Sequence, residues 1–288
     1  VVSIDKKGIK TVGSVAKRKL LADPLNTFYS TKRFIGKRSS EISKELLSKY
    51  PYEFDLTEEK VKLICPKLKK SIDCEEISAQ ILLHVKKTAE KFKNQVINKC
   101  VITVPAYFNN NQRSATRTAA EIAGLKVLRI IAEPTAAAYA YGCEKMESNK
   151  NIFVADLGGG TFDISLINFQ EEQLASVIAS DGDTELGGDD FTYTIFNLIK
   201  ENILSKYKDF DLDLKTKILL INEAERVKCQ LSEEHNAEIN LRALTTTNNN
   251  FFNHEMSITR AEFESASEHI MSKIIRKIKN FLDSKQVK

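Results

Sequence analysis

The sequence predicts an α/β fold divided into two lobes, and three observations carry that prediction. Residues 101–142 alternate between strand-like and helix-like patterns. Residues 151–169, NIFVADLGGGTFDISLINF, show near-alternating apolar side chains on both sides of three glycines, as two strands joined by a tight tip do. A chain of 288 residues with 42% hydrophobic content can bury a sizeable core, and its length fits two lobes better than one compact layer.

The N-terminal part mixes short predicted strands, over residues 1–73, with the lysine-bearing segment NTFYSTKRFIG at 26–36. A long amphipathic helix begins within the next segment, residues 71–92. The apolar stripe that we expect this helix to bury is formed by Ile77, Ile81, Val85 and Phe92.

The middle of the chain predicts two strands and two helices in alternation. They are a strand at 101–104, a helix at 110–123, a strand at 126–131 and a helix at 134–142. Gly124 suits a helix C-terminus and Pro134 suits a helix start. Glu133 therefore falls at the end of a strand, where an open α/β sheet presents its ligand-facing residues.

The polar loop at 142–151 is interpreted as the crossing between lobes, and the glycine-containing pair of strands follows it. Helices are expected at 191–207, 217–234 and 262–282, with strands at 237–241 and 255–259 and a polar tip at 245–250. A second glycine-rich segment, SDGDTELGGDDF at 180–191, leads into the first of these helices. It is either a further ligand loop or only a connection.

The glycines at 158–160 form the predicted hairpin tip. Residues without a Cβ can take positive φ, and their N–H groups can then converge on one anionic centre, for which phosphate is the natural ligand. The tip is neither a P-loop nor a Rossmann turn, because a strand follows it and no lysine lies in it. Asp156, Thr161 and Asp163 suit hydrated Mg²⁺ and a water beside a polyphosphate. The alternative is a structural hairpin with solvated acids.

Six segments resemble the ATPase domain of the 70-kDa heat-shock chaperones, the DnaK family, whose fold is shared with actin and sugar kinases. They are NTFYSTKRFIG (26–36), VITVPAYFNNNQR (101–113), IAGLKVLRIIAEPTAAAYAYG (122–142), DLGGGTFD (156–163), GDTELGGDDF (182–191) and EAERVKCQLS (223–232). They occur in family order through most of the chain. The resemblance implies an actin-like (ribonuclease H-like), two-lobed ATPase domain.

The resemblance also implies where the lobes lie. Lobe I would cover residues 1–145, with an outer part at 1–73 and a core part at 74–145. Lobe II would cover residues 146–288, with a core part made of 146–185 and 267–288 and an outer part at 186–266.

Roles at the phosphates follow from the resemblance. Lys32 would reach the γ-phosphate and offset charge as the terminal phosphoryl group departs, although taken alone it could be a solvated lysine. Glu133 would help to hold the waters of Mg²⁺, Asp156 would orient the metal and the attacking water, and Asp163 would be a ligand in the shell of magnesium or potassium. The clasp around the β- and γ-phosphates would be Gly158, Gly159, Gly160 and Thr161.

The resemblance also implies which residues contact the nucleoside, and three of them lie on one predicted helix. Glu225, Lys228 and Ser232, at i, i+3 and i+7, match the family's adenosine-contacting residues, and Gly187 and Gly188 complete the predicted nucleotide-binding set. Without the resemblance, such spacing is more often an ordinary charged helix face. The implied cofactors are ATP or ADP with Mg²⁺, and K⁺ is a further candidate.

The implied function is an ATP-hydrolysing chaperone domain of the stress response. Nucleotide-driven lobe closure would control peptide binding by a separate domain in protein folding. Pro105, Arg113 and Glu133 match the relay proposed to carry that signal, and Arg129 with Thr135 match a contact surface for a J-protein. The implied partners are unfolded client peptides, a J-protein co-chaperone and a nucleotide exchange factor.

Departures from the family pattern limit this expectation. The chain opens without the family's first phosphate hairpin and ends before its adenosine-covering loop, so we expect a fragment, incomplete at both ends, that alone hydrolyses ATP poorly. Ala132 replaces the usual Asn and Glu185 the usual His. An alternative is a degenerate nucleotide-binding scaffold or co-chaperone without turnover. An actin-like filament protein or a sugar kinase would need other lobe insertions or a sugar pocket.

Composition excludes several classes of protein. The net charge of +4, from 43 basic and 39 acidic residues, is too balanced to indicate a nucleic-acid partner. No uncharged run approaches the roughly 18 residues that a membrane helix needs. The five cysteines are odd in number and lack a CxxC spacing, so neither a disulfide framework nor a zinc site is indicated.

The sequences of several segments, including ICP at 64–66, resemble those of cyanobacterial and plastid members of the family. Together with the cysteine content, which favours a reducing compartment, this points to the plastid (chloroplast) stroma. The alternatives are a bacterial-type cytoplasm and the mitochondrion.

Overall fold

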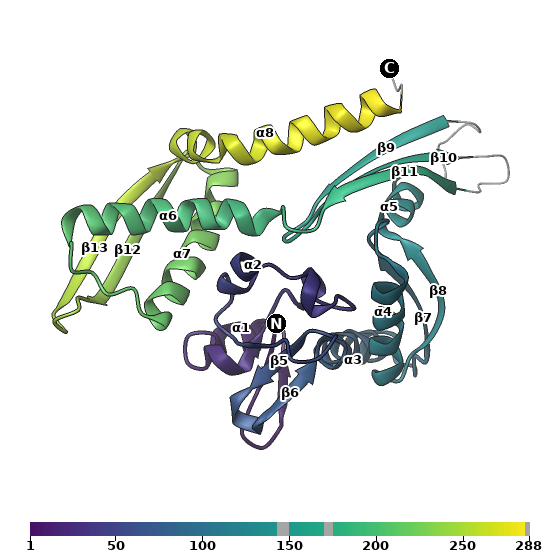
Figure 1. Cartoon of the computed structure of the whole chain (residues 1–288), viewed down its shortest axis with the longest axis horizontal. Coiled ribbons are helices and arrows are strands. Elements are labelled where there is room, and N and C mark those ends of the chain that lie inside the picture. The colour runs from purple at the N-terminus through teal and green to yellow at the C-terminus, as the bar shows by residue number, and fades with distance from the viewer. Residues whose placement is uncertain (143–149, 170–174, 286–288) are drawn as a thin grey trace. The chain divides into compact units, whose positions relative to one another are not determined.

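The computed structural model describes residues 1–142, 150–169 and 175–285 (Figure 1). The chain divides into two compact units, the first with residues 1–156 and 163–185 and the second with residues 157–162 and 186–288. Most of the predicted crossing loop at 142–151, with Cys143, lies outside the described residues. The lobe boundaries implied by the resemblance remain predictions.

The first unit begins with two small antiparallel sheets, of strand order β2-β1-β3 and β4-β5-β6. Their strands are β1 (Val2–Ile4), β2 (Lys10–Val12), β3 (Thr27–Phe28), β4 (Phe54–Asp55), β5 (Lys62–Cys65) and β6 (Lys70–Asp73). Between them lie the short helices α1 (Ser14–Lys19) and α2 (Lys44–Ser48) and the 3₁₀ turns η1 (Pro24–Asn26), η2 (Thr31–Arg33), η3 (Ser39–Glu41) and η4 (Pro66–Leu68).

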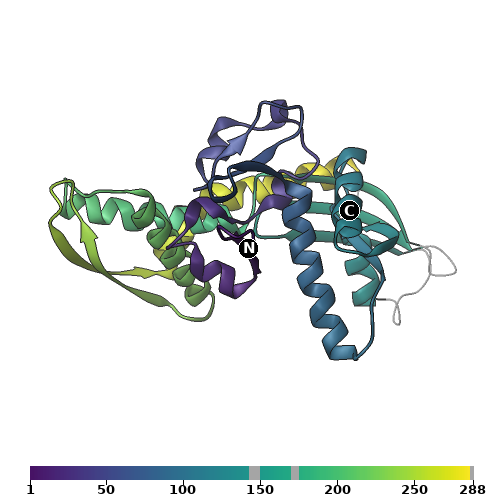
Figure 2. The ribbon, with the colours of Figure 1, turned by 90° about the horizontal axis from the view of Figure 1, so that it is seen from below.

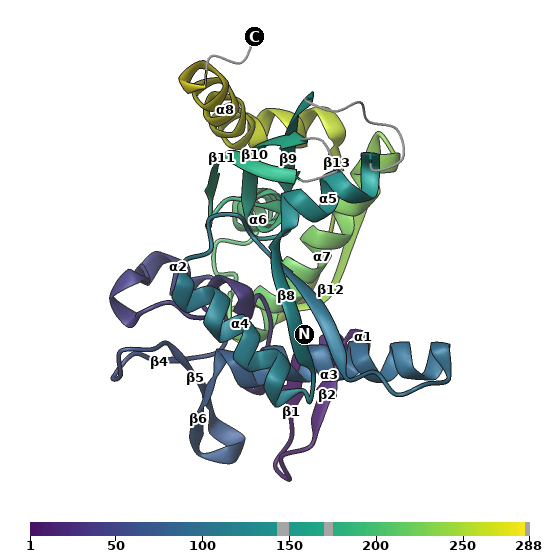
Figure 3. The same ribbon diagram turned by 90° about the vertical axis from the view of Figure 1, so that its right-hand side faces the viewer.

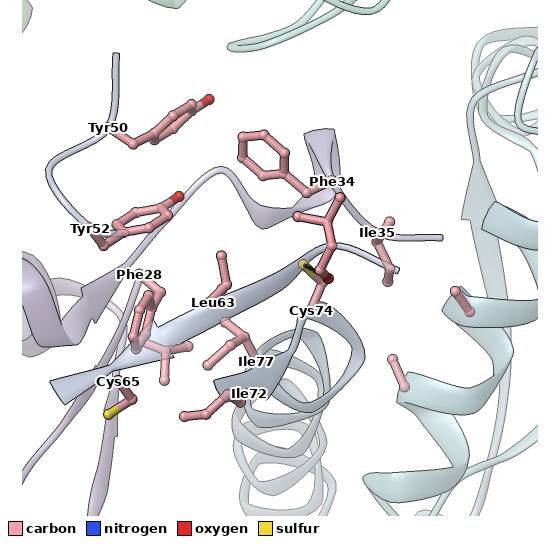
Figure 4. Packing of buried hydrophobic residues seen from close by; sticks show 14 of the residues in the cluster. Phe28, Phe34, Ile35, Tyr50, Tyr52, Leu63, Cys65, Ile72, Cys74 and Ile77 are labelled. Carbon is pink, nitrogen blue, oxygen red and sulfur yellow. Dashed lines mark hydrogen bonds between the residues drawn. The ribbon is translucent and has the colours of Figure 1, made fainter. Parts of the chain in front are cut away.

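An aromatic core holds these sheets together. Figure 4 shows the rings of Phe28, Phe34, Tyr50 and Tyr52 around Leu63 of β5. Neighbouring rings pack edge-on or tilted, with centroids 5.2–5.4 Å apart, a geometry that favours aromatic pairs. The Tyr52 hydroxyl donates to the carbonyl of Tyr29, and burial raises the pKa of Tyr52 well above its usual value.

The predicted alternation in the middle of the chain is confirmed. Strand β7 (Lys99–Val104) pairs in parallel with β8 (Lys126–Ala132), and helix α4 (Asn110–Ile122) connects them (Figure 3). Helix α3 (Cys74–Lys93) precedes β7, and α5 (Glu133–Gly142) follows β8 directly. Gly124 has a φ of 71° just after α4, the left-handed conformation expected after a helix C-terminus.

The predicted apolar stripe of α3 is wrong beyond its first residue. Ile77 is buried against the aromatic core, but Ile81 is at the border of exposure, and Val85 and Phe92 are 58% and 82% exposed. The aromatic core covers the side of the helix that carries Ile77 only near the start of the helix. Further along, a different set of side chains packs against α4, β7 and β8, namely Ala79, Leu82 and Leu83.

The first unit also contains a three-stranded sheet of order β11-β10-β9. Its strands are β9 (Lys150–Leu157), β10 (Phe162–Phe169) and β11 (Ala175–Asp183). Helix α5 covers this sheet through Ala138, which packs against Ile167, Ile152 and Val154. The predicted glycine hairpin is therefore confirmed, with its body in the first unit and its tip in the second.

The second unit is formed by three long helices and a hairpin, as predicted (Figure 2). They are α6 (Gly188–Lys206), α7 (Leu214–Glu233), β12 (Asn236–Thr245), β13 (Phe251–Thr259) and α8 (Arg260–Ser284). Ile195 and Phe196 of α6 pack against Leu220 and Val227 of α7, and one face of the hairpin completes this core. The core fixes the distance between α6 and α7, on which the site below depends.

Cys65, Cys74, Cys100 and Cys229 are free thiols in the described ranges. Across those same ranges, no helix combines the length and the apolar content needed to cross a bilayer.

Candidate phosphate and nucleoside sites

The glycine tip closes with one backbone hydrogen bond. The Gly158 N–H donates to the Thr161 carbonyl at 2.9 Å, so Gly159 and Gly160 lie at the turn. None of these glycines has the positive φ that the sequence reasoning assumed, since among the described residues the left-handed glycines are 8, 13, 36 and 124. A left-handed backbone is therefore not the reason for glycine at this tip.

The tip packs closely against the start of α6, and this contact requires glycine at position 187. The N–H groups of Gly188 and Asp189 donate to the carbonyls of Gly158 and Gly159 at 2.9 and 2.7 Å. A Cβ on Gly187 would lie only 2.7 Å from Gly159 O and Gly160 N. The two predicted glycine-rich segments thus form one structural element, in which Gly187 has no room for a side chain, whereas a Cβ on Gly158, Gly159 or Gly188 would be at ordinary contact distance.

This packing suits the tip to an anion. The first N–H groups of α6 point at the tip carbonyls, so the positive end of the helix dipole lies directly behind the tip. The N–H groups of Gly159, Gly160 and Thr161 make no backbone hydrogen bond to any residue of the described ranges. Three adjacent donors with a helix N-terminus behind them can bind a phosphate group.

Two of the predicted nucleoside residues are joined to the same element. Lys228 Nζ lies 2.6 Å from Glu225 Oε2, and it donates to the Gly188 carbonyl at 3.2 Å. Ser232 is exposed and its hydroxyl donates to the Lys228 carbonyl at 3.3 Å, one helical turn back. The structure therefore brings Glu225 and Lys228 together at the start of α6 and leaves Ser232 apart from them.

Sequence reasoning missed Thr192. Its hydroxyl lies 2.5 Å from Glu225 Oε2 and 2.9 Å from Lys228 Nζ, and the residue is only 5% exposed. No local pattern could have pointed to it, because Thr192 lies on α6 and its partners lie on α7, 33 and 36 residues further along the chain.

The first unit contains a separate pair of predicted catalytic residues. Lys32, in η2, donates to Glu133 Oε1 at 2.8 Å, and Glu133 is the first residue of α5. The lysine side chain is half exposed and the glutamate is 23% exposed. A pair as open to solvent as this contributes little to stability, so its cation remains available to an anionic ligand.

Three carboxylates are the predicted Mg²⁺ ligands. Asp156 is exposed near the end of β9, Asp163 is buried in β10, and Glu133 is paired with Lys32. In the part of the chain that the structure describes, no three His, Cys, Asp or Glu side chains lie close enough together to hold a metal ion. Hard oxygen donors dispersed in this way fit an ion that keeps its own waters, and they do not form an all-protein cage.

Two of the three predicted relay residues, Pro105 and Arg113, belong to one loop contact of the first unit, and the third, Glu133, begins α5. Arg113 donates to the carbonyls of Phe108 and Ala106, at 2.8 and 3.0 Å, and thereby holds the loop that follows Pro105. Arg129 is exposed on β8, and Thr135 is half-buried in α5. Of the two departures, Ala132 ends β8, and Glu185 follows β11 and donates its N–H to Asp183 at 2.9 Å.

Comparison with known proteins was made over the whole sequence. Residues 1–288 match the family described as Hsp70 protein. Similar curated proteins include the chaperone protein dnaK of Guillardia theta, 44% identical over 284 residues, and that of Emiliania huxleyi, 43% identical over 283 residues; each alignment covers 98% of this chain and 45% of the relative. The DnaK of Prochlorococcus marinus (strain MIT 9515) is 42% identical over 95% of this chain and 43% of its own length. The chain thus spans a little under half the length of these relatives.

Proposed function

The chain belongs to the Hsp70 family, whose ATPase domain has the actin-like α/β fold, and from this premise we propose that it binds and hydrolyses ATP as the motor of a chaperone. One observation supports this most strongly: the start of α6 is bonded to the glycine tip, behind the three tip N–H donors. The arrangement suits a polyphosphate, because it joins a helix N-terminus to three adjacent N–H groups that make no other backbone hydrogen bond in the described ranges.

Each predicted residue has a role in this proposal. Gly158, Gly159, Gly160 and Thr161 would bind the β- and γ-phosphates of ATP, or the β-phosphate of ADP. Lys32 would leave its contact with Glu133, bind the γ-phosphate and neutralise charge in the transition state. Asp156 would orient the attacking water. Mg²⁺ would neutralise phosphate charge when bound, with Glu133, Asp156 and Asp163 holding its waters, and K⁺ is a further candidate at Asp163.

The nucleoside would contact the face of α7 that carries Glu225 and Lys228. A carboxylate accepts hydrogen bonds from hydroxyl or amino groups, so Glu225 would offer acceptors to the nucleoside, and Lys228, which donates to Glu225, would hold that carboxylate in place. Gly187 and Gly188 would contact the nucleotide through their backbone atoms. Ser232 would contact it only if the bound nucleoside extends one turn further along α7.

Chaperone action and partners belong to the same proposal. Lobes I (residues 1–145) and II (residues 146–288) would close on nucleotide and control peptide binding by a separate domain. Client peptides, a J-protein at Arg129 and Thr135, and an exchange factor are the proposed partners. The relatives come from algae and a cyanobacterium, which supports a plastid or bacterial-type protein. We place it in the plastid stroma.

The experiment compares Mg-ATP turnover and ATP binding for wild type, Lys32→Ala and Lys44→Ala. Lys44 is an exposed lysine of α2 that forms no ion pair with any residue in the described ranges, so its variant controls for loss of a surface charge. We expect wild type and Lys44→Ala to turn over alike, and Lys32→Ala to bind ATP but hydrolyse it about 100-fold more slowly. A wild type that binds ATP without turnover would instead favour a nucleotide-binding scaffold, and one that does not bind ATP would refute the proposal.

A further inference from the structure

Thr192 is a buried polar residue at the contact between α6 and α7. It lies in the second turn of α6, and its hydroxyl has three partners within hydrogen-bond distance: Glu225 Oε2 at 2.5 Å, Lys228 Nζ at 2.9 Å and the Gly188 carbonyl at 3.1 Å. A buried hydroxyl is favourable only where such partners are present. Here two of the three are the charged groups predicted to face the nucleoside.

The chemistry of the groups fixes the direction of most of these bonds. A carboxylate only accepts and an ammonium only donates, whereas a hydroxyl has one hydrogen to give. Thr192 therefore accepts from Lys228. Its single hydrogen goes to Glu225, because the contact with this carboxylate is the shorter one and hydrogen bonds to ionised acceptors are the stronger ones.

Lys228 is saturated in this arrangement. Its three N–H hydrogens have three acceptors, namely Glu225 Oε2 at 2.6 Å, Thr192 Oγ1 at 2.9 Å and the Gly188 carbonyl at 3.2 Å. The ammonium is therefore held in one place, and Glu225 Oε2 is held between Lys228 and Thr192. The other carboxylate oxygen, Oε1, has the Cys229 thiol 3.8 Å away.

The Gly188 peptide connects this set to the glycine tip. Its N–H donates to Gly158 and its carbonyl accepts from Lys228. The hydrogen bonds thus run without a break from the tip, through Gly188, to Lys228, Thr192 and Glu225. Any displacement of Glu225 relative to the tip must break one of them.

We propose that Thr192 is a positioning residue, which holds the Glu225 carboxylate and the Lys228 ammonium at the spacing from the glycine tip that a nucleoside polyphosphate requires. The inference rests on the proposed function and deepens it. A purely structural role explains less, because the apolar contacts of Ile195, Phe196 and Val227 already pack α6 against α7. A valine would satisfy that packing equally well.

The test separates binding from chemistry. For wild type, Thr192→Val, Thr192→Ser and Thr194→Val, the Kd of ATP and the single-turnover hydrolysis rate at saturating ATP are measured, with thermal midpoints as a check on folding. Thr194 is the matched control, because it lies on the same helix and its hydroxyl bonds only a backbone carbonyl, Asp190 O at 3.2 Å.

We expect Thr192→Val to raise the Kd of ATP about tenfold, the effect of losing one hydrogen bond to a charged group, and to leave the saturated rate within about twofold of wild type. Thr192→Ser should restore the Kd, and Thr194→Val should not change it. An unchanged Kd in Thr192→Val, an equal loss of binding and rate, or a failure of serine to restore the Kd would overturn the inference. A wild type that does not bind ATP would overturn the proposed function itself, and is recognised without any variant.

Discussion

Replacing Gly187 by alanine tests whether the proposed phosphate site depends on the close contact between α6 and the tip. Gly187 has φ −174° and ψ −170°, an extended conformation that alanine also adopts, so the substitution introduces no backbone strain of its own. Its methyl would lie 2.7 Å from Gly159 O and Gly160 N, about 0.7 Å inside the 3.4 Å at which ordinary contact begins. Both atoms are backbone, so no side chain can rotate away.

The clash must therefore move the tip or the start of α6. Either movement lengthens the bonds from Gly188 and Asp189 to the tip carbonyls, which are 2.9 and 2.7 Å long. Since a 1 Å misplacement at a reacting centre can reduce a rate by about 100-fold, we expect Gly187→Ala to lower ATP hydrolysis by about 30- to 100-fold. Overpacking of this kind also destabilises the fold by about 1–3 kcal/mol.

The assay is single-turnover hydrolysis with ATP binding measured in parallel, on protein whose thermal transition shows that it is folded. Gly188→Ala is the comparison, because its methyl would meet its nearest neighbours at 3.5 Å, an ordinary contact distance. We expect its loss of rate to be at least tenfold smaller than that of Gly187→Ala. Folded Gly187→Ala that hydrolyses ATP within about threefold of wild type would refute the steric reasoning, and so would equal losses in both variants.

Three further predictions concern stability. Gly36→Ala is expected to destabilise the fold by about 1–3 kcal/mol more than Gly8→Ala in chemical unfolding, because both sites have positive φ but only at Gly36 would a methyl clash, 2.6 Å from the Cα of Gln112. Burial, reinforced by a nearby lysine, lowers the pKa of His254 from its usual 6.5. The unfolded chain therefore binds a proton at higher pH than the folded chain does. The thermal midpoint should fall as pH drops below about 6.5, and it should fall less in His254→Phe. Asp213→Ala should lose about 1 kcal/mol in urea unfolding, because the Asp213 side chain caps α7 by accepting from a backbone N–H at 2.7 Å.

A specific result would contradict each of these three predictions. Equal losses at Gly36 and Gly8 would mean that backbone conformation alone matters at both. A wild type whose midpoint is flat between pH 7 and 5, or a His254→Phe variant with the same slope, would remove the histidine from the explanation. Asp213→Asn should keep most of the stability, since Asn is an equally good cap, and an Asn variant as weak as the Ala variant would argue for a charge effect instead.

The sequence predicted the elements of this fold well where their signals are local. The helix at 110–123 ends at a glycine, the helix at 134–142 follows a proline start, and the hairpin at 151–169 alternates in its side chains. Each signal lies within a few residues of the feature that it predicts. The structure has α4 at Asn110–Ile122 and α5 at Glu133–Gly142, within a residue or two of these expectations.

Burial along α3 could not be predicted in the same way. Ile77, Ile81 and Val85 are four residues apart, and each such step advances by about 40° around a helix that has 3.6 residues per turn. Val85 therefore lies about 80° away from Ile77. Which of these directions is covered depends on the length of the neighbouring elements, and the aromatic core covers only the start of α3.

The candidate site shows the same division between local and long-range information. The i, i+3 spacing predicts that Glu225 and Lys228 are neighbours, as the structure has them, and Ser232, four residues further and so about 6 Å along the helix axis, stays a prediction. What selects Glu225 and Lys228 is the position of α6, which brings Thr192 and the Gly188 carbonyl to them. No spacing within α7 contains that information.

The glycines illustrate why physical reasoning has to continue after a motif has been found. The two glycine-rich segments, 158–160 and 187–188, were interpreted separately, and the first was explained by positive φ. In the structure the two segments are in contact, and the first explains the second, because a side chain on Gly187 would clash with the backbone of Gly159. The contact allows the N-terminus of α6 to satisfy two of its N–H groups on the tip carbonyls and still direct its dipole toward whatever the tip binds. Glycine is thus required at position 187 by the approach of two backbones, and a side chain there is expected to weaken the proposed phosphate site.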